Sequence, residues 1–179
     1  CGWSQGGQMA IIGAALDERI RAIVSVCGWG PLRGIGGARA HNWAQSYNFP
    51  RLSPCLNGAQ PLSIDFDEIV ACLAPRPFLD VRAEADETFP NRELATAALN
   101  GLQQLWQGVD AAAAFALTGA AGGHAHGHVA AAAQLQWLQE GAKAGDSLVF
   151  AFGGHGMKIP VYPGVNCKYP GCFLHGILP

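Results

Sequence analysis

Short apolar segments alternate with helical patterns along this chain of 179 residues. The segment at 22–27 (AIVSVC) is apolar and rich in β-branched residues, as buried strands of a parallel sheet are. Residues 91–106 repeat apolar side chains at the helical period of about 3.6 residues. Strands that alternate with helices indicate the α/β class, in which right-handed crossovers join parallel strands.

The remaining elements continue this alternation. The expected helices are 5–16, 65–73, 91–106 and 129–140, and the expected strands are 22–27, 78–83, 112–117 and 147–152. Gly28–Pro61 is rich in glycine, proline and aromatic residues and has no clear period. We expect this excursion to be irregular, with aromatic side chains that either line a pocket or pack on the surface. The last twenty residues contain four prolines and predict an irregular tail.

Composition excludes several classes of protein. The chain is 50% hydrophobic and 13% charged, which favours a folded domain over a disordered one. The net charge of -2 argues against nucleic-acid binding, and no apolar run reaches the roughly 18 residues typical of a membrane helix. The six cysteines are dispersed, without metal or disulfide spacing. We expect Cys27 and Cys72 to be buried thiols and the compartment to be reducing and cytoplasmic.

Residues 2–6 (GWSQG) form a G-x-S-x-G pentapeptide that opens the first expected helix. In this motif a serine lies on a sharp turn between a strand and a helix, which exposes its Oγ and requires small neighbours. The backbone N–H of the next residue then points at a developing oxyanion. Ser4 is therefore a candidate nucleophile and Gln5 a candidate oxyanion donor. Trp3 either walls the pocket or packs against the sheet.

A serine nucleophile needs a histidine base and a carboxylate that orients this base. In folds with this turn, the chain order is serine, acid, histidine, and each lies in the loop after a strand. The loop after the 78–83 strand contains three carboxylates, and the loop after the 112–117 strand contains GGHAHGH at 122–128. The sequence therefore has both partners where this order requires them.

The motifs resemble the α/β-hydrolase superfamily, and within it the dienelactone-hydrolase-like and acetyl-xylan-esterase-like branch, which is related to prolyl-oligopeptidase-type catalytic domains. The resemblance rests on residues 2–28, 64–81 (IDFDEIVACLAPRPFLDV), 84–90 (EADETFP) and 122–128. It implies a catalytic triad in an α/β-hydrolase fold. Ser4 would be the nucleophile, Asp86 ahead of the Phe-Pro pair the acid, and His124 after the glycine pair the base.

Alternatives remain open for the acid and for the histidine segment. Glu84 or Glu87 could serve as the acid in place of Asp86. His126 and His128 could bind a metal ion together with the base, because alternate imidazoles on an extended segment converge on one side. No further ligand cluster accompanies them, so we expect one catalytic histidine and two solvated ones. The triad chemistry needs no cofactor, and none is expected.

A complete α/β-hydrolase has several strands before its serine, and a loop near the third strand supplies a second oxyanion donor. Here no strand is expected before the first helix, and Cys1 lies at or near the end of the nucleophile strand. We expect residues 1–143 to be the C-terminal part of a hydrolase domain, a truncated fold with a mostly parallel sheet flanked by helices. Loss of a donor costs about 10²–10³-fold in rate. We therefore expect an incomplete or inactive hydrolase, with self-association through an open sheet edge.

Residues 144–179 are expected to form an appended strand and an irregular tail. Within it, residues 145–156 (GDSLVFAFGGHG) resemble a core strand and the histidine motif of metacaspases, which belong to the caspase-like clan. This resemblance implies that His155 is the base of a Cys–His dyad. Neither Cys167 nor Cys172 has the sequence context of that family's nucleophile, so we expect the dyad to be incomplete.

Three functions follow from these observations. The first is a serine hydrolase that cleaves a small-molecule ester or a peptide-like amide through an acyl-enzyme on Ser4. The second is a remnant of a caspase-like cysteine peptidase that uses His155. The third is a non-catalytic fragment or interaction module. No nucleic-acid or membrane partner is expected.

Overall fold

A computed structural model describes residues 1–33, 35, 37–45, 48–89, 92–124 and 151–153. In this part of the chain, strands form one sheet in the order β4-β3-β2-β1-β5, and each neighbouring pair runs parallel. The strands are β1 (Gly2–Ser4), β2 (Ile23–Val26), β3 (Phe78–Ala83), β4 (Phe115–Ala120) and β5 (Ala151–Gly153). The helices are α1 (Gln5–Leu16), α2 (Gly37–Trp43), α3 (Ser53–Leu56), α4 (Phe66–Ala71) and α5 (Arg92–Gly108), with short 3-10 turns at Pro50–Leu52 and Ala112–Ala114.

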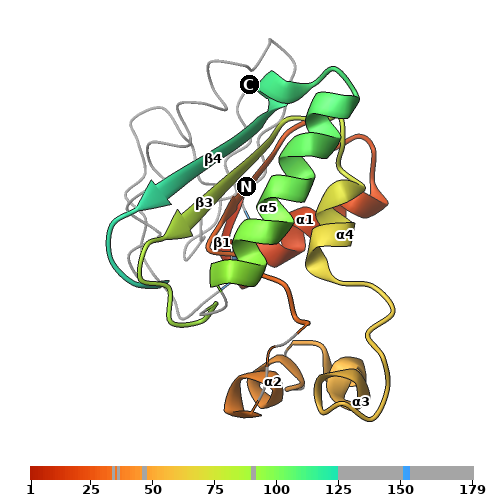
Figure 1. The fold of residues 1–179 in the computed structure, drawn as a ribbon, viewed down its shortest axis with the longest axis vertical. Coiled ribbons are helices and arrows are strands. Elements are labelled where there is room, and N and C mark those ends of the chain that lie inside the picture. The colour runs from red at the N-terminus through yellow and green to blue at the C-terminus, as the bar shows by residue number, and fades with distance from the viewer. Residues whose placement is uncertain (34, 36, 46–47, 90–91, 125–150, 154–179) are drawn as a thin grey trace, which may run out of the picture.

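Helices α1, α4 and α5 lie on the same face of the sheet (Figure 1). They contribute Ile11, Val70 and Trp106 to a buried cluster that also contains Phe78 of β3 and Phe115 of β4. Successive strand residues point to opposite faces, so the intervening positions form a second buried cluster on the other face. Its members include Val24, Val26, Leu79 and Val81. The sheet is therefore buried on both faces, as parallel sheets are.

The predicted fold class is confirmed: the protein is an α/β protein with a parallel sheet flanked by helices. Helix 5–16 and strand 78–83 agree with the prediction at both ends. The strand expected at 112–117 was placed too early, because Ala112–Ala114 forms a 3-10 turn and β4 begins at Phe115. A run of alanines carries no β-branched side chain to favour a strand. The helix expected at 129–140 lies outside the described residues.

A strand precedes the first helix, which differs from the expected order. The short β1 contains Ser4 itself and pairs with β2 on one side. On its other side β1 pairs with β5, where Gly2 faces Ala151 and Ser4 faces Gly153. The edge of β1 was expected to be open, and in the structure it is occupied by β5. Self-association therefore stays a prediction, and the sheet edges within the described residues are β4 and β5.

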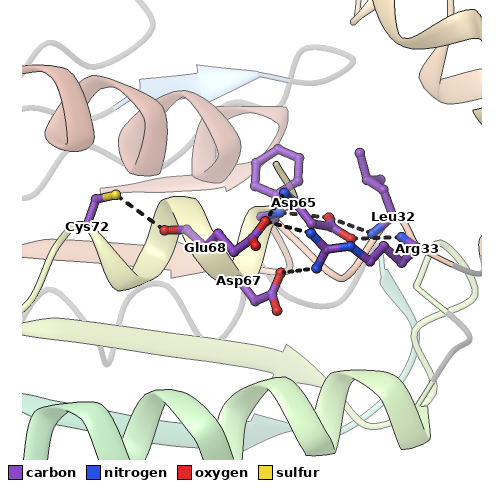
Figure 2. A network of polar contacts seen from close by, with 7 residues as sticks. Leu32, Arg33, Asp65, Asp67, Glu68 and Cys72 are labelled. Carbon is purple, nitrogen blue, oxygen red and sulfur yellow. Dashed lines mark hydrogen bonds and ion pairs between the residues drawn. The ribbon is translucent and has the colours of Figure 1, made fainter. Parts of the chain in front are cut away.

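The excursion between β2 and α4 is anchored by one buried carboxylate (Figure 2). Asp65, only 1% exposed, accepts backbone N–H groups of Leu32 and Arg33 at 2.8 Å and of Phe66 at 2.7 Å. Glu68 accepts the Asp65 N–H at 2.7 Å, which completes a capping box at the start of α4. The Arg33 guanidinium also bonds Glu68 at 2.7 Å. These contacts fix both ends of the excursion to one helix terminus.

The aromatic residues of the excursion mostly pack. Trp29 and Trp43 are 1% and 4% exposed, and the Trp43 ring lies 5.9 Å from that of Phe66 and 5.5 Å from that of Phe89. These two tryptophans therefore belong to the buried core, which neither expectation described, whereas Phe49 of the excursion lines a cavity. Phe89 belongs to the loop after β3, so the excursion is packed directly against that loop.

The two cysteines expected to be buried differ. Cys27 is 2% exposed, as expected. Cys72 is exposed, so that prediction was wrong. The buried side of the α4 segment follows the helical period through Phe66, Val70 and Leu73, and Cys72 falls off this stripe. Its Sγ instead lies 3.3 Å from the Glu68 carbonyl oxygen, to which it donates.

Candidate active site

Ser4 lies at the sharp turn between β1 and α1. Its backbone has φ 54° and ψ -124°, a left-handed conformation that costs a non-glycine residue about 1–3 kcal/mol. Helix α1 begins at the next residue, Gln5, so Ser4 stands at the positive end of a helix. The strained turn is what the G-x-S-x-G spacing predicts, and it places the hydroxyl at the carboxyl end of the sheet.

The turn requires α1 to approach the sheet closely, and two glycines allow this. A Cβ added to Gly7 would lie 2.8 Å from the Gly28 Cα and 2.9 Å from the Ser25 Oγ. A Cβ added to Gly28 would lie 2.4 Å from that same Oγ and 2.7 Å from the Gly7 Cα. Both distances to backbone are too short for real Cβ atoms. The first turn of α1 therefore packs against the end of β2 only because both positions are glycine.

Ser4, His124 and Asp86 form a continuous hydrogen-bonded chain. The Ser4 Oγ lies 2.8 Å from the His124 Nε2, and the His124 Nδ1 lies 3.0 Å from both carboxylate oxygens of Asp86. The side chains of His124 and Asp86 are 14% and 10% exposed. When Nδ1 donates its proton to Asp86, Nε2 is left as the acceptor for the serine hydroxyl. This is the geometry that a nucleophile, base and orienting acid require.

Asp86 is held as a carboxylate by its surroundings. Burial opposes its ionisation, but the hydrogen bond and charge of His124 and the backbone N–H groups of Thr88 and Phe89 outweigh burial and lower the pKa of Asp86. Its Oδ1 accepts those N–H groups at 2.8 Å and 3.3 Å. The acid is therefore charged and fixed in orientation before any substrate arrives.

His124 is also fixed through its backbone. Its N–H donates to Glu87 Oε2 at 2.9 Å, and its carbonyl oxygen accepts from Trp3 Nε1 at 3.3 Å. The rings of Trp3 and Phe89 lie 5.8 Å and 6.1 Å from the imidazole. The bond from His124 lowers the pKa of Glu87. From the sequence, Glu87 is only an alternative acid, because a side-chain contact to a backbone N–H in another loop has no sequence signature.

Of the other predicted site residues, some lie within the described part of the chain and some lie outside it. Gln5 is the first residue of α1, directly after Ser4, so its backbone N–H lies at the helix terminus. Glu84 is exposed, and its carboxylate lies near Gly119 of β4. His126 and His128 lie outside the described residues, as do His155, Cys167 and Cys172.

Cys27 is a neighbour of the acid and the base that sequence reasoning did not connect with them. It follows β2 with a positive φ of 47°. One ligand-type atom from each of Cys27, Asp86 and His124 lies within 4.8 Å of the others. Burial and the negative charge of Asp86 raise the pKa of the Cys27 thiol to about 12. The group beside the acid is thus a neutral thiol.

An apolar cavity of about 450 Å³ lies elsewhere, between α1, α4 and the excursion. It is lined by residues such as Ile12, Phe49, Leu52 and Ile69, and by none of the Ser4, Asp86 and His124 side chains. In the part of the chain that the structure describes, no helix has the length and apolar character needed to cross a membrane.

Comparison with known proteins identifies solved structures that share this fold. A glucuronoyl esterase from Solibacter usitatus matches with a TM-score of 0.55 and 19% identity, over 69% of this chain and 37% of that one. A carbohydrate esterase family 15 glucuronoyl esterase from Caldicellulosiruptor kristjansonii matches with a TM-score of 0.56 and 19% identity, over 79% of this chain and 43% of that one. The glucuronoyl esterase catalytic domain Cip2_GE from Hypocrea jecorina matches with a TM-score of 0.56 and 15% identity, over 75% of this chain and 40% of that one.

These similarities concern the fold. This chain spans less than half the length of each of the three structures. No protein-family model matches the sequence, and no curated protein resembles it significantly.

Proposed function

We propose that this protein is a serine hydrolase that cleaves esters through an acyl-enzyme on Ser4. The observation that carries the proposal is a hydrogen-bonded chain in which Ser4 Oγ lies 2.8 Å from His124 Nε2 and His124 Nδ1 lies 3.0 Å from Asp86. The Ser4 backbone has a positive φ at the start of a helix. A strained serine persists only where the surrounding structure fixes it, and such strain concentrates at functional sites.

Each residue has a defined role in the proposed reaction. His124 Nε2 takes the hydroxyl proton as Ser4 Oγ attacks the ester carbonyl, and the Gln5 N–H donates to the oxyanion that develops. The imidazolium then gives its proton to the departing alcohol. In the second half, His124 activates a water molecule that releases the acid from Ser4. Asp86 keeps the proton on Nδ1 and stabilises the imidazolium, without being protonated itself.

An ester is preferred to an amide as the substrate because three solved proteins with this fold are esterases by their printed names. An alkoxide oxygen is also a better leaving group than an amide nitrogen, so cleavage of an ester depends less strongly on proton donation from His124. The finer resemblance to dienelactone hydrolases stays a prediction, because fold similarity does not separate branches of one superfamily. The peptidase alternative at His155 has no support from the described residues.

Hydrolysis assays test the proposal. The protein is expected to release 4-nitrophenol from 4-nitrophenyl acetate more slowly when Ser4 or His124 is replaced by alanine, by about 10³-fold or more. 4-Nitroanilide analogues of the same acyl group measure the preference for esters, and a methyl ester of glucuronic acid tests the substrate class named for the fold neighbours. Equal rates for the wild type and Ser4→Ala would contradict the proposal and favour either the inactive hydrolase expected from the sequence or a non-catalytic module.

A further inference from the structure

We propose that Cys27, Asp86 and His124 form a binding site for a thiophilic divalent cation such as Zn²⁺ or Cd²⁺, and that metal binding there switches off Ser4. The binding is inferred from the geometry of three residues. Only the inhibition rests on the proposed function.

The three side chains offer one sulfur, one nitrogen and one oxygen ligand in a single cluster. Their ligand atoms all lie within 4.8 Å of one another, and the Asp86 oxygens are 3.0 Å from the His124 Nδ1. In tetrahedral zinc sites the bonds are about 2.0–2.3 Å, which places neighbouring ligand atoms roughly 3.3–3.7 Å apart. Small side-chain movements therefore suffice to bring all three atoms onto one ion.

The charge balance of the cluster suits a divalent ion. Ionised Cys27 and ionised Asp86 would place two negative charges side by side in a largely buried site, which disfavours the thiolate when no ion is bound. A divalent cation carries the two positive charges that neutralise both ligands, and a coordinating thiol is deprotonated by the metal. Asp86 Oδ1 already accepts two backbone N–H groups, so Oδ2 is the oxygen better placed for the metal.

Metal binding would act on the serine through the imidazole. Coordination forms metal–S, metal–O and metal–N bonds at Cys27, Asp86 and His124 Nδ1, and these ligands displace water molecules bound to the free cation. The thiol proton leaves to solvent, and the imidazole proton moves from Nδ1 to Nε2. A protonated Nε2 no longer accepts the Ser4 hydroxyl proton. One proton is released for each cation bound, and the base is held in the wrong tautomer.

Titration with Cd²⁺ alone tests the binding, because a cadmium–thiolate bond gives a charge-transfer absorption in the ultraviolet. The wild type is expected to bind one Cd²⁺ at this site with that absorption and with release of one proton. A variant in which the other five of the six cysteines are alanine is expected to behave in the same way. Cys27→Ala is expected to lose the thiolate signal of this site and to bind at least about tenfold more weakly. Cys72→Ala is the matched control, because it removes an exposed thiol.

Three results would overturn the metal site. The first is an unchanged affinity and proton release in Cys27→Ala. The second is loss of binding in His126→Ala or His128→Ala with retention in Cys27→Ala, which would assign the metal to the histidine segment. The third is absence of a charge-transfer band in the variant that keeps only Cys27. Cys27→Ser is measured in parallel, and thermal unfolding of each variant verifies that it is folded.

A separate experiment tests the inhibition. Cd²⁺ is expected to slow labelling of Ser4 by a fluorophosphonate in the wild type, and the same concentration is expected to leave the labelling rate of Cys27→Ala at that variant's own metal-free value. If Cd²⁺ binds as described but labelling does not change, the inhibitory role is wrong and the metal site stands. If Ser4 is unlabelled in metal-free wild type, the proposed function fails while the binding result is unaffected.

Discussion

The position of His124 is fixed by contacts at its two ring nitrogens and at both of its backbone polar groups. The ring nitrogens face Ser4 and Asp86, the N–H donates to Glu87, and the carbonyl accepts from Trp3. These partners come from the strand before α1 and from the loop after β3. Catalytic geometry tolerates displacements well below 1 Å, so such contacts matter as much as the identity of the base.

Glu87 is expected to act as a positioning residue for His124. Replacing Glu87 by alanine removes the acceptor of the His124 N–H and should slow fluorophosphonate labelling of Ser4 by about tenfold or more. Glu87→Gln retains a carbonyl acceptor and should stay within about threefold of the wild type. An equal loss in both variants would show that the charge of Glu87, and not its contact with the backbone, is what matters.

The depressed pKa of Asp86 predicts how stability depends on pH. A carboxyl whose folded pKa is lowered contributes stability that is present above its unfolded pKa of about 3.9 and is lost as the pH falls through the folded value. Between pH 6 and pH 3, the urea midpoint of the wild type should therefore fall more than that of Asp86→Asn. Parallel curves for the two proteins would show that Asp86 is not linked to folding in this way.

At the scale of elements, the site depends on how closely α1 approaches the sheet and on how the excursion is attached. Gly7 and Gly28 allow α1 to approach the sheet closely, since each occupies the space where the other's Cβ would lie. Asp65 attaches the excursion to α4 by accepting backbone N–H groups from Leu32, Arg33 and Phe66. The excursion in turn packs on Phe89, in the loop that carries the acid.

Replacing Asp65 by alanine should therefore destabilise the fold. The change leaves buried N–H groups without an acceptor and removes the cap of α4, at a cost of about 2–4 kcal/mol in the free energy of unfolding. Asp67→Ala is the matched control from the same helix turn. Its 3.8 Å ion pair with half-exposed Arg33 is worth about 0–1 kcal/mol. Urea unfolding measures both, and comparable losses in the two variants would contradict the anchoring role of Asp65.

At the scale of the whole molecule, helices and strands could be predicted from local sequence patterns, whereas contacts between distant segments could not. The period of 91–106 and the apolar run at 22–27 predicted α5 and β2, because these signals lie within one element. The G-x-S-x-G turn predicted the conformation of Ser4 for the same reason. The pairing of β1 with β5 joins segments about 150 residues apart, and the cluster of Cys27 with Asp86 joins two loops. Neither leaves a periodic signal in the sequence.

The pairing of β5 with β1 predicts that residues 151–153 support the serine turn. A chain that ends at residue 150 lacks β5 and exposes the edge of β1 beside Ser4. In this shorter chain a fluorophosphonate should label Ser4 more slowly. The chain should also self-associate as its concentration rises, as proteins with unpaired strand edges do. A chain that ends at residue 153 retains β5 and is the matched control. Identical labelling and identical sedimentation of the two chains would show that β5 has no such role.

Covalent labelling of Ser4 tests most directly whether this serine is the nucleophile. The protein is treated with a fluorophosphonate, and the modified residue is located by mass spectrometry in the wild type, Ser4→Ala and His124→Ala. We expect modification at Ser4 in the wild type, none in Ser4→Ala, and a rate reduced by about 10³-fold or more in His124→Ala. A folded wild type that stays unmodified, or a label on another residue, would contradict the assignment of Ser4 as the nucleophile.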